Sequence, residues 1–159
     1  MLKAKLDSVR KNKKGFSLVE LIIVIAIMVA LIAVMAPSFV KYVQKSRDSA
    51  LATAAESLYT AMQTYYGDPD EDPDTGVTLL VYANGGESIK IYKDSKADGN
   101  VVTGSSAADA TDAQRIVDIA GVDTSKTMGK ASVYYTLTAT APAAGSTGYT
   151  FSMTKATVA

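Results

Sequence analysis

The sequence predicts an α+β protein in which one long N-terminal helix packs against a small antiparallel β-sheet. Three observations support this class. An apolar run over residues 16–36 contains one charge, Glu20. Apolar residues then recur every three or four positions as far as Tyr65, which is typical of an amphipathic helix. The second half of the chain holds short β-rich segments separated by turn residues. The expected parts are a basic leader over 1–15, an apolar helical half over 16–36, an amphipathic half of the same helix over 37–66, and a head domain over 67–159.

The leader is strongly basic. It contains one acidic residue, Asp7, and six basic residues, which are Lys3, Lys5, Arg10, Lys11, Lys13 and Lys14. A basic flank of an apolar span stays in the cytoplasm. We therefore expect the N-terminus in the cytoplasm and the residues after the apolar run outside it.

The apolar run is long enough to cross a membrane. As a helix, 21 residues measure about 31 Å, close to a bilayer core of about 30 Å. A secretory signal peptide is one alternative, but its apolar region is shorter and ends in a small-x-small site. The nearest such site here, Val34 to Ala36, is followed by Pro37, which disfavours cleavage.

A plain membrane anchor is a second alternative, and Glu20 argues against it. A carboxylate inside hydrocarbon costs about 2.5 to 3.5 kcal/mol, so such acids are functional candidates. Cleavage between Gly15 and Phe16 would create an α-amino group with a pKa near 8, charged at neutral pH. We expect a neighbouring subunit to bring this amine and Glu20 together, because both charges are costly when buried alone.

The motif Lys13-Lys14-Gly15-Phe16-Ser17-Leu18-Val19-Glu20, followed by an apolar run and a proline, resembles the N-terminus of type IV pilins. The resemblance implies the pilin fold and a prepilin peptidase that cuts between Gly15 and Phe16. It also implies N-methylation of Phe16. Glu20 would neutralise the N-terminal amine of a neighbouring subunit in the filament, and Pro37 would bend the helix.

The resemblance further implies a role and a set of partners. The chain would be the structural subunit of an extracellular type IV pilus, a helical homo-oligomer, and not an enzyme. It would be made as a single-pass precursor in the cytoplasmic membrane. A polytopic platform protein and a cytoplasmic assembly ATPase would then polymerise it. A pseudopilin of a secretion or DNA-uptake machine is the first alternative. A membrane-anchored extracellular enzyme or binding module is the second.

The chain departs from the family pattern at three points. Many pilins have a glycine where this chain has Val29 and a second proline where it has Ser57. Pilins of Gram-negative bacteria usually carry a C-terminal disulfide, and this chain has no cysteine. In that respect it is similar to pilins of Gram-positive bacteria, clostridia among them.

Beyond Pro37 the pattern predicts that the helix continues with a kink, because proline removes one backbone hydrogen bond. The helix should end near Gly67, where Asp68-Pro69 follows. The sheet is expected to bury the periodic stripe of this half, made of Val40, Val43, Arg47, Leu51, Ala54, Leu58, Met62 and Tyr65.

An acidic segment follows the helix and could be a calcium loop. Calcium takes several oxygen ligands, and the candidates are Asp68, Asp70, Asp72 and Asp74. The spacing does not fit an EF-hand, since a register that starts at Asp70 places Gly76 one residue late. A solvated acidic loop is the interpretation we favour, and no cofactor is expected.

The head domain should be mostly strand. Strands are predicted over 77–83 and 88–92 around the turn 84–86, and over 132–140 and 149–157 around the loop 141–148. In the last strand Tyr149, Phe151 and Met153 should form an apolar face. A helix is expected from Ser105 or Ser106 through Ala120, with Gly121 just past its end.

The composition excludes several functions. The whole chain has sixteen basic and sixteen acidic residues, but without the leader it has ten basic and fifteen acidic residues. The mature chain is therefore negatively charged, and nucleic-acid binding is not expected. Histidine and cysteine are absent, which removes imidazole catalysis and the usual ligands of transition metals. The nine tyrosines are scattered and favour packing over a binding platform.

Overall fold

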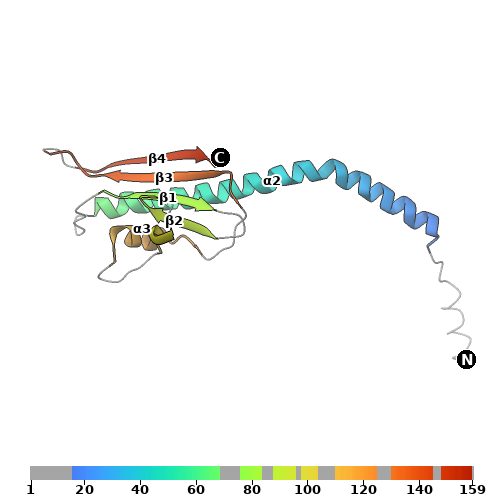
Figure 1. Cartoon of the computed structure of the whole chain (residues 1–159), viewed down its shortest axis with the longest axis horizontal. Coiled ribbons are helices and arrows are strands. Elements are labelled where there is room, and N and C mark those ends of the chain that lie inside the picture. The colour runs from blue at the N-terminus through green and yellow to red at the C-terminus, as the bar shows by residue number, and fades with distance from the viewer. Residues whose placement is uncertain are drawn as a thin grey trace, which may run out of the picture. The chain divides into compact units, whose positions relative to one another are not determined.

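The computed structural model describes residues 16–68, 76–83, 88–95, 98–103, 110–124, 130–144 and 148–158. Its elements follow the predicted order of a long helix and then a sheet (Figure 1). The chain divides into two compact units, Met1–Lys41 and Tyr42–Ala159.

Helix α2 runs over Leu18–Gly67 and has 50 residues. It begins two residues later than predicted, because Ser17 occupies the capping position before it. It ends at Gly67 as predicted, and Asp68 donates its N–H to the carbonyl of Tyr65 at 3.4 Å. Pro37 lies inside the helix.

The second unit contains a four-stranded antiparallel sheet of order β2-β1-β3-β4. Both predicted hairpins are confirmed, and each strand lies within one residue of its predicted bounds. The strands are β1 (Thr78–Ala83), β2 (Ile89–Lys93), β3 (Val133–Thr140) and β4 (Thr150–Thr157). The pairing that joins the hairpins was not predicted. It places Leu79 opposite Leu137 and Val81 opposite Tyr135.

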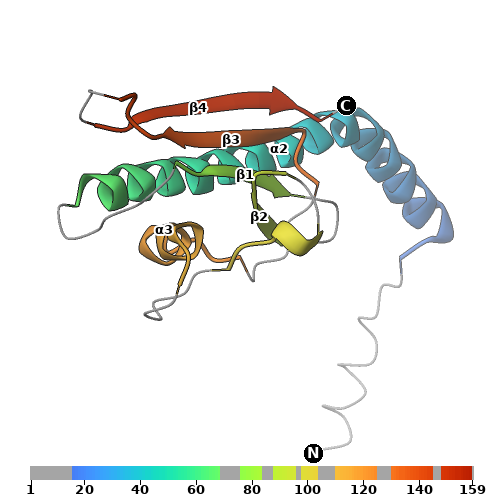
Figure 2. The same cartoon turned by 60° about the vertical axis from the view of Figure 1, so that its left-hand side comes forward.

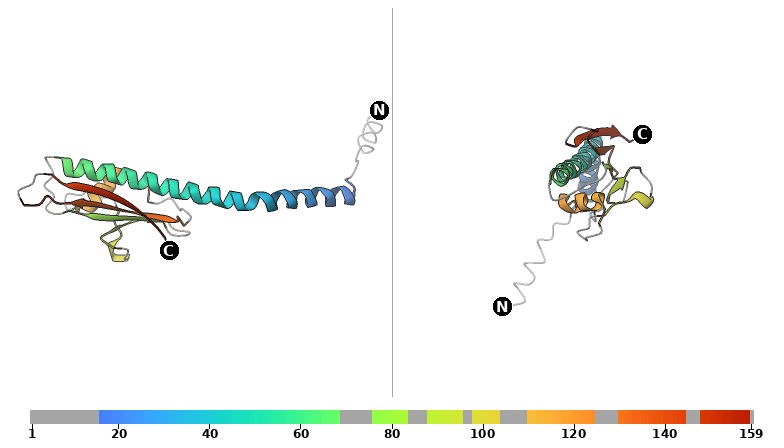
Figure 3. Two further views of the ribbon diagram at one scale, coloured as in Figure 1. Left: turned by 90° about the horizontal axis from the view of Figure 1, so that it is seen from above. Right: turned by 90° about the vertical axis from the view of Figure 1, so that its left-hand side faces the viewer.

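The later part of α2 lies along one face of this sheet (Figure 2 and Figure 3). The largest fully buried side chains come from α2, β1, β2, β3 and α3, and they are Leu51, Leu58, Met62, Leu79, Ile91, Ile116, Leu137 and Val81. Among the described residues no polar or charged side chain is buried. Apolar burial is therefore the main term that holds α2 to the sheet.

The predicted stripe on α2 is confirmed only from Leu51 onward. Its members from Leu51 to Tyr65 are buried, whereas Val43 and Arg47 are half-buried. Val40 is 66% exposed and belongs to the first unit, where the described large apolar side chains are exposed. The expectation that the sheet buries Val40 was wrong.

Helix α3 spans Asp112–Ala120, so the predicted start at Ser105 or Ser106 was wrong. Those serines lie outside the described residues, and Thr111 caps the helix instead. The Thr111 N–H donates to the Gln114 side chain at 2.9 Å, as in a capping box. Gly121 takes the left-handed conformation at the C-terminus, as predicted. A short 3₁₀ turn, η1 (Asp98–Asn100), was not predicted.

The aromatic residues pack between elements. The Tyr65 hydroxyl donates to Asp112 at 2.9 Å, which ties α2 to α3. The Tyr66 ring lies 4.4 Å from the Tyr149 ring and 6.1 Å from the Phe151 ring. Burial, and then the charge of Asp112, raise the pKa of Tyr66 above its ordinary value, so it stays neutral. The apolar face of β4 is only partly covered, because β4 is an edge strand and Met153 is 39% exposed.

Candidate assembly site on the long helix

The start of α2 carries its own cap. The Ser17 backbone N–H donates to Glu20 Oε2 at 3.3 Å, and the Ser17 carbonyl accepts the Leu21 N–H at 3.1 Å. The first N–H groups of a helix have no partner within the helix, and an acid at the third helical position can satisfy one of them. Glu20 therefore has a partner within its own chain.

We did not predict this contact, although the sequence contained the signal. Ser17 followed three residues later by Glu20, just before an apolar run, is a capping-box pattern. A carboxylate has about four lone-pair sites on its two oxygens, so one hydrogen bond from Ser17 leaves room for a second donor. The cap and the predicted pairing with an amine are therefore compatible.

Phe16 stands at the exposed end of this site. Its side chain is 85% exposed. Its nitrogen is an amide while the leader is attached, and only cleavage turns it into an amine. Gly15 lies outside the described residues, so the cut between Gly15 and Phe16 stays a prediction.

The described chain presents an apolar surface from Phe16 to Tyr42. Every large apolar side chain from Phe16 to Tyr42 is between 48% and 85% exposed. By length and composition α2 contains a segment able to cross a membrane, and none of that segment is buried. Surfaces of this kind mark contact with lipid or with another protein.

Two other predicted positions lie on this surface. Val29 and Pro37 both lie within α2, which continues on either side of them. A proline inside a helix leaves one carbonyl of the preceding turn without its usual donor. The assembly role of Pro37 and the effect of Val29 stay predictions.

Most of the candidate calcium ligands lie outside the described residues, so calcium binding stays a prediction. Asp68 is exposed just after α2, whereas Asp70, Asp72 and Asp74 lie outside the described residues. Within the described ranges no group of three or more acidic residues could hold a metal ion.

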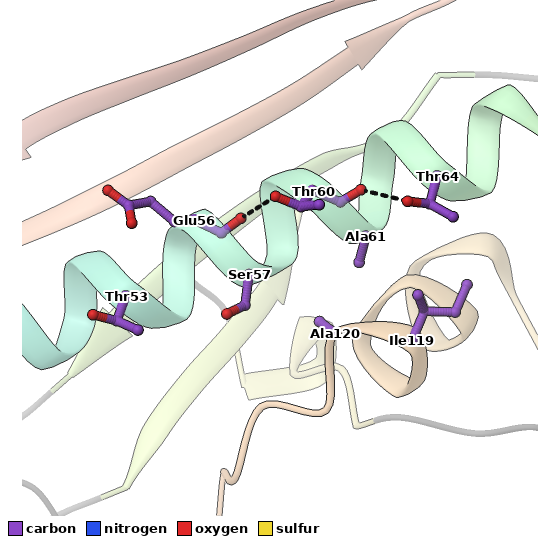
Figure 4. A pocket seen from close by; sticks show the side chains of 8 residues that line it. All are labelled: Thr53, Glu56, Ser57, Thr60, Ala61, Thr64, Ile119 and Ala120. Carbon is purple, nitrogen blue, oxygen red and sulfur yellow. Dashed lines mark hydrogen bonds between the residues drawn. The ribbon is translucent and has the colours of Figure 1, made fainter.

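A groove of about 490 Å³ runs between α2 and α3 (Figure 4). Ser57, the position of a proline in many pilins, is one of its lining residues. The Thr60 hydroxyl donates to the Glu56 carbonyl and the Thr64 hydroxyl to the Thr60 carbonyl, both at 3.0 Å. Both hydroxyls thus donate to carbonyls of the same helix. The described lining of the groove does not place a nucleophile beside a general base.

The structure thus has an α+β architecture like that of a pilin, with a capped, exposed apolar helix at its N-terminus. Residues 10–36 match the family model of the prokaryotic N-terminal methylation motif. This match begins within the basic leader and ends just before Pro37.

The chain is also similar to two type IV major pilins. It is 38% identical over 63 residues to the protein PilA of Myxococcus xanthus (strain DK1622), which covers 40% of this chain and 29% of the relative. It is 33% identical over 91 residues to the protein PilE of Neisseria gonorrhoeae, which covers 57% of this chain and 54% of the relative. The chain therefore spans less than two thirds of either relative. No solved structure matches it.

These findings confirm the predicted resemblance to type IV pilins. They support a subunit of the pilin or pseudopilin kind with a membrane-anchored precursor. The expected likeness to Gram-positive pilins stays a prediction.

Proposed function

We propose that this chain is a structural subunit of an extracellular type IV pilus, and that it polymerises through the first half of α2. The observation that carries the proposal is the exposed apolar surface from Phe16 to Val40, which begins at the methylation motif and contains one charge, Glu20. A soluble monomer could not keep this surface in water, since contiguous apolar patches of this kind are rare on monomers.

Processing would prepare this surface. In the proposed sequence a prepilin peptidase cuts between Gly15 and Phe16, and the new Phe16 amine is methylated. The basic leader holds the N-terminus in the cytoplasm until the cut is made. Removal of the leader also removes the charges that oppose extraction of α2 from the membrane.

Assembly would then transfer α2 from lipid into a bundle of helices from neighbouring copies. Lipid chains and a helical bundle are both apolar, so close packing and polar pairing must favour the transfer. Pro37 would allow the helix to bend where it leaves the bundle. The regular helix at Val29 would pack in that bundle without the glycine that many pilins have there.

Glu20 would serve in both environments. In the membrane its carboxylate accepts the Ser17 N–H, which reduces the number of unsatisfied polar groups in hydrocarbon. In the filament it would also accept the methylated Phe16 amine of a neighbouring copy. This pairing would set the register between subunits.

The proposed partners are further copies of this chain, the prepilin peptidase, a platform membrane protein and a cytoplasmic assembly ATPase. The proposed location is the cytoplasmic membrane before assembly and the cell surface afterwards. The role is structural and not enzymatic, which agrees with the names of both relatives. The negative charge of the mature chain does not favour nucleic acid as a partner.

A pseudopilin would share the same N-terminal motif. The names of the two relatives, both major pilins, favour a pilus subunit. The two roles differ in the product, since a pilin forms long surface filaments and a pseudopilin short ones within the envelope. A membrane-anchored enzyme or binding module would instead keep its leader.

The deciding experiment combines electron microscopy of material sheared from cells with mass spectrometry of the N-terminus. We expect long filaments that contain this chain, with methylated Phe16 as the first residue. A chain processed in this way but absent from sheared filaments would favour the pseudopilin. An unprocessed N-terminus in the mature protein would contradict both.

A further inference from the structure

A cluster of polar side chains joins α2 to the start of β3 within the second unit. Asp48 lies one turn before Leu51, the first fully buried residue of α2. Its Oδ1 accepts the Ser132 backbone N–H at 2.8 Å, and its Oδ2 accepts the Ser132 hydroxyl at 2.5 Å. Both oxygens of one carboxylate thus bind one residue that is 84 positions away in the sequence.

Gln44 extends this cluster by one helical turn. Its side-chain amide donates to Asp48 Oδ1 at 3.1 Å and to the Lys130 carbonyl at 3.2 Å. The chain therefore binds to α2 on both sides of Ala131, through Lys130 and through Ser132. The contacts make a short bridge across the entry into β3.

Ser132 is also connected to the rest of the sheet. Its carbonyl accepts the Val158 N–H at 2.8 Å, just past the end of β4. The preceding Ala131 N–H donates to the Ala83 carbonyl of β1 at 3.3 Å. One end of the sheet therefore meets α2 through the polar contacts of Asp48 and Gln44.

We propose that Gln44, Asp48 and Ser132 form an acid-released clasp, in which ionised Asp48 fastens this end of the sheet to α2 and its protonation frees that end while the core stays closed. The opening is confined to the polar contacts, because on α2 the apolar core begins only at Leu51 and continues away from the clasp to Tyr66, while Ala131 beside Ser132 stays buried in that core. Those contacts do not depend on the charge of Asp48. The clasp concerns the folded subunit and does not rest on the proposed assembly.

The electrostatic environment supports a carboxylate in this position. Partial burial raises the pKa of Asp48, but the hydrogen bonds from Ser132 and Gln44 and the charge of Lys155 on β4 outweigh it. The net effect holds the pKa of Asp48 below its ordinary value of 3.8. The charged residues close to the cluster in the sequence, Lys45 and Arg47 on α2 and Lys130 before β3, are also basic.

The direction of the pH dependence follows from this shift. A carboxyl group whose pKa is lower in the folded state stabilises the fold above its ordinary pKa, and that stabilisation is lost as the pH falls through the lowered value. The clasp should therefore be closed at neutral pH and open only in acid, below 3.8.

Amide hydrogen exchange of the full chain in non-ionic detergent micelles tests the clasp. Asp48→Asn keeps the shape of the side chain but removes its charge, and its amide nitrogen cannot accept the hydrogen bond that the Ser132 hydroxyl donates to Oδ2. We expect the protection of the Ser132 amide near neutral pH to fall on the order of tenfold or more, since a hydrogen bond to a charged group is lost. The protection of the Leu58 and Leu137 amides should not change. In the unmodified chain the same loss at Ser132 should appear in acid.

Glu56→Gln is the matched control, because it removes one exposed charge from the same helix without touching the sheet. If Asp48→Asn prevents folding, Ser132→Ala serves instead, and carbon NMR of the Asp48 carboxyl group should then show a raised pKa. Unchanged protection at Ser132, or an unchanged pKa in Ser132→Ala, would overturn the clasp. So would an equal loss of protection at Leu58 and Leu137, because Asp48 would then support the whole core.

Discussion

At the scale of single residues, Glu20 shows how one carboxylate can serve two states of the same chain. Its contact with Ser17 exists within one molecule and needs no partner. The proposed contact with a neighbouring amine needs cleavage and a second copy. In the proposed membrane precursor the first contact would satisfy one polar group, and the second would give the acid a function in assembly.

The two contacts can be separated by substitution. Glu20→Gln can still accept the Ser17 N–H, because glutamine also occurs at this position of capping boxes. It cannot neutralise an amine. We expect normal insertion and cleavage of Glu20→Gln, but a yield of sheared filaments lower on the order of tenfold, since an unpaired buried charge is costly. Filament protein is measured in shear fractions and precursor cleavage by mass spectrometry.

Glu20→Ala removes both contacts. Glu56→Gln is the control, because it neutralises another glutamate of α2 far from the start of the helix. The first should assemble no better than Glu20→Gln, and the second should assemble normally. If Glu20→Gln formed filaments as well as the unmodified chain while Glu20→Ala did not, capping rather than charge would be the role of Glu20.

At the scale of elements, the contact between β1 and β3 turns two hairpins into one sheet. Gly76 lies just before β1, where the Val77 carbonyl accepts the Ala139 N–H at 2.9 Å. A Cβ atom at Gly76 would run into the carbonyl oxygen of Ala139. That oxygen belongs to the backbone of a buried strand and cannot move aside cheaply.

Gly76→Ala should therefore destabilise the sheet. We expect the free energy of unfolding to fall by about 1 to 3 kcal/mol, as for other insertions into well-packed sites. Denaturant unfolding followed by circular dichroism measures this. Gly67→Ala is the control, because nothing lies within 4 Å of a Cβ at Gly67. Equal stability of the two variants would contradict the close approach.

The elements also show what the sequence could predict. Strand bounds were predicted within one residue, because alternation and turn residues are local signals. The end of α2 at Gly67 was predicted for the same reason. The predicted start of α3 was wrong because we took Ser105 or Ser106 as the cap, whereas Thr111 forms the capping-box contact with Gln114.

Long-range contacts left no such signal. Asp48 and Ser132 are 84 positions apart, and each looks like an ordinary surface residue in the sequence. The β1–β3 pairing likewise depends on how two hairpins meet. At the assembly site the motif identified Glu20, but our prediction considered only an intermolecular partner and missed Ser17.

At the scale of the whole molecule, the described core belongs entirely to the second unit. Its first member along the chain is Leu51 and its last is Ala139, and all of them lie within Tyr42–Ala159. The first unit supplies exposed apolar side chains and no member of that core. The requirements for folding and for assembly thus fall on different residues.

A chain that begins at Tyr42 should therefore fold without the apolar segment. We expect a soluble monomer, since the truncation removes the exposed apolar surface but keeps the core and the clasp. Size-exclusion chromatography would show whether the truncated chain is a monomer. Thermal unfolding would show whether it unfolds cooperatively. The full chain in detergent is the comparison. Aggregation or loss of the β-sheet signal in the truncated chain would show that residues 16–41 contribute to folding.

Among the described residues no member of the core lies before Leu51, and this has a practical consequence for protein engineering. If this segment polymerises as proposed, it can be joined to another folded domain, because it contributes no described residue to the core. Residues 1–41 could then act as a portable export and display tag, with the α2 residues after Lys41 serving as the graft point. The native head domain would then be one of several domains that the proposed assembly route could display on the cell surface.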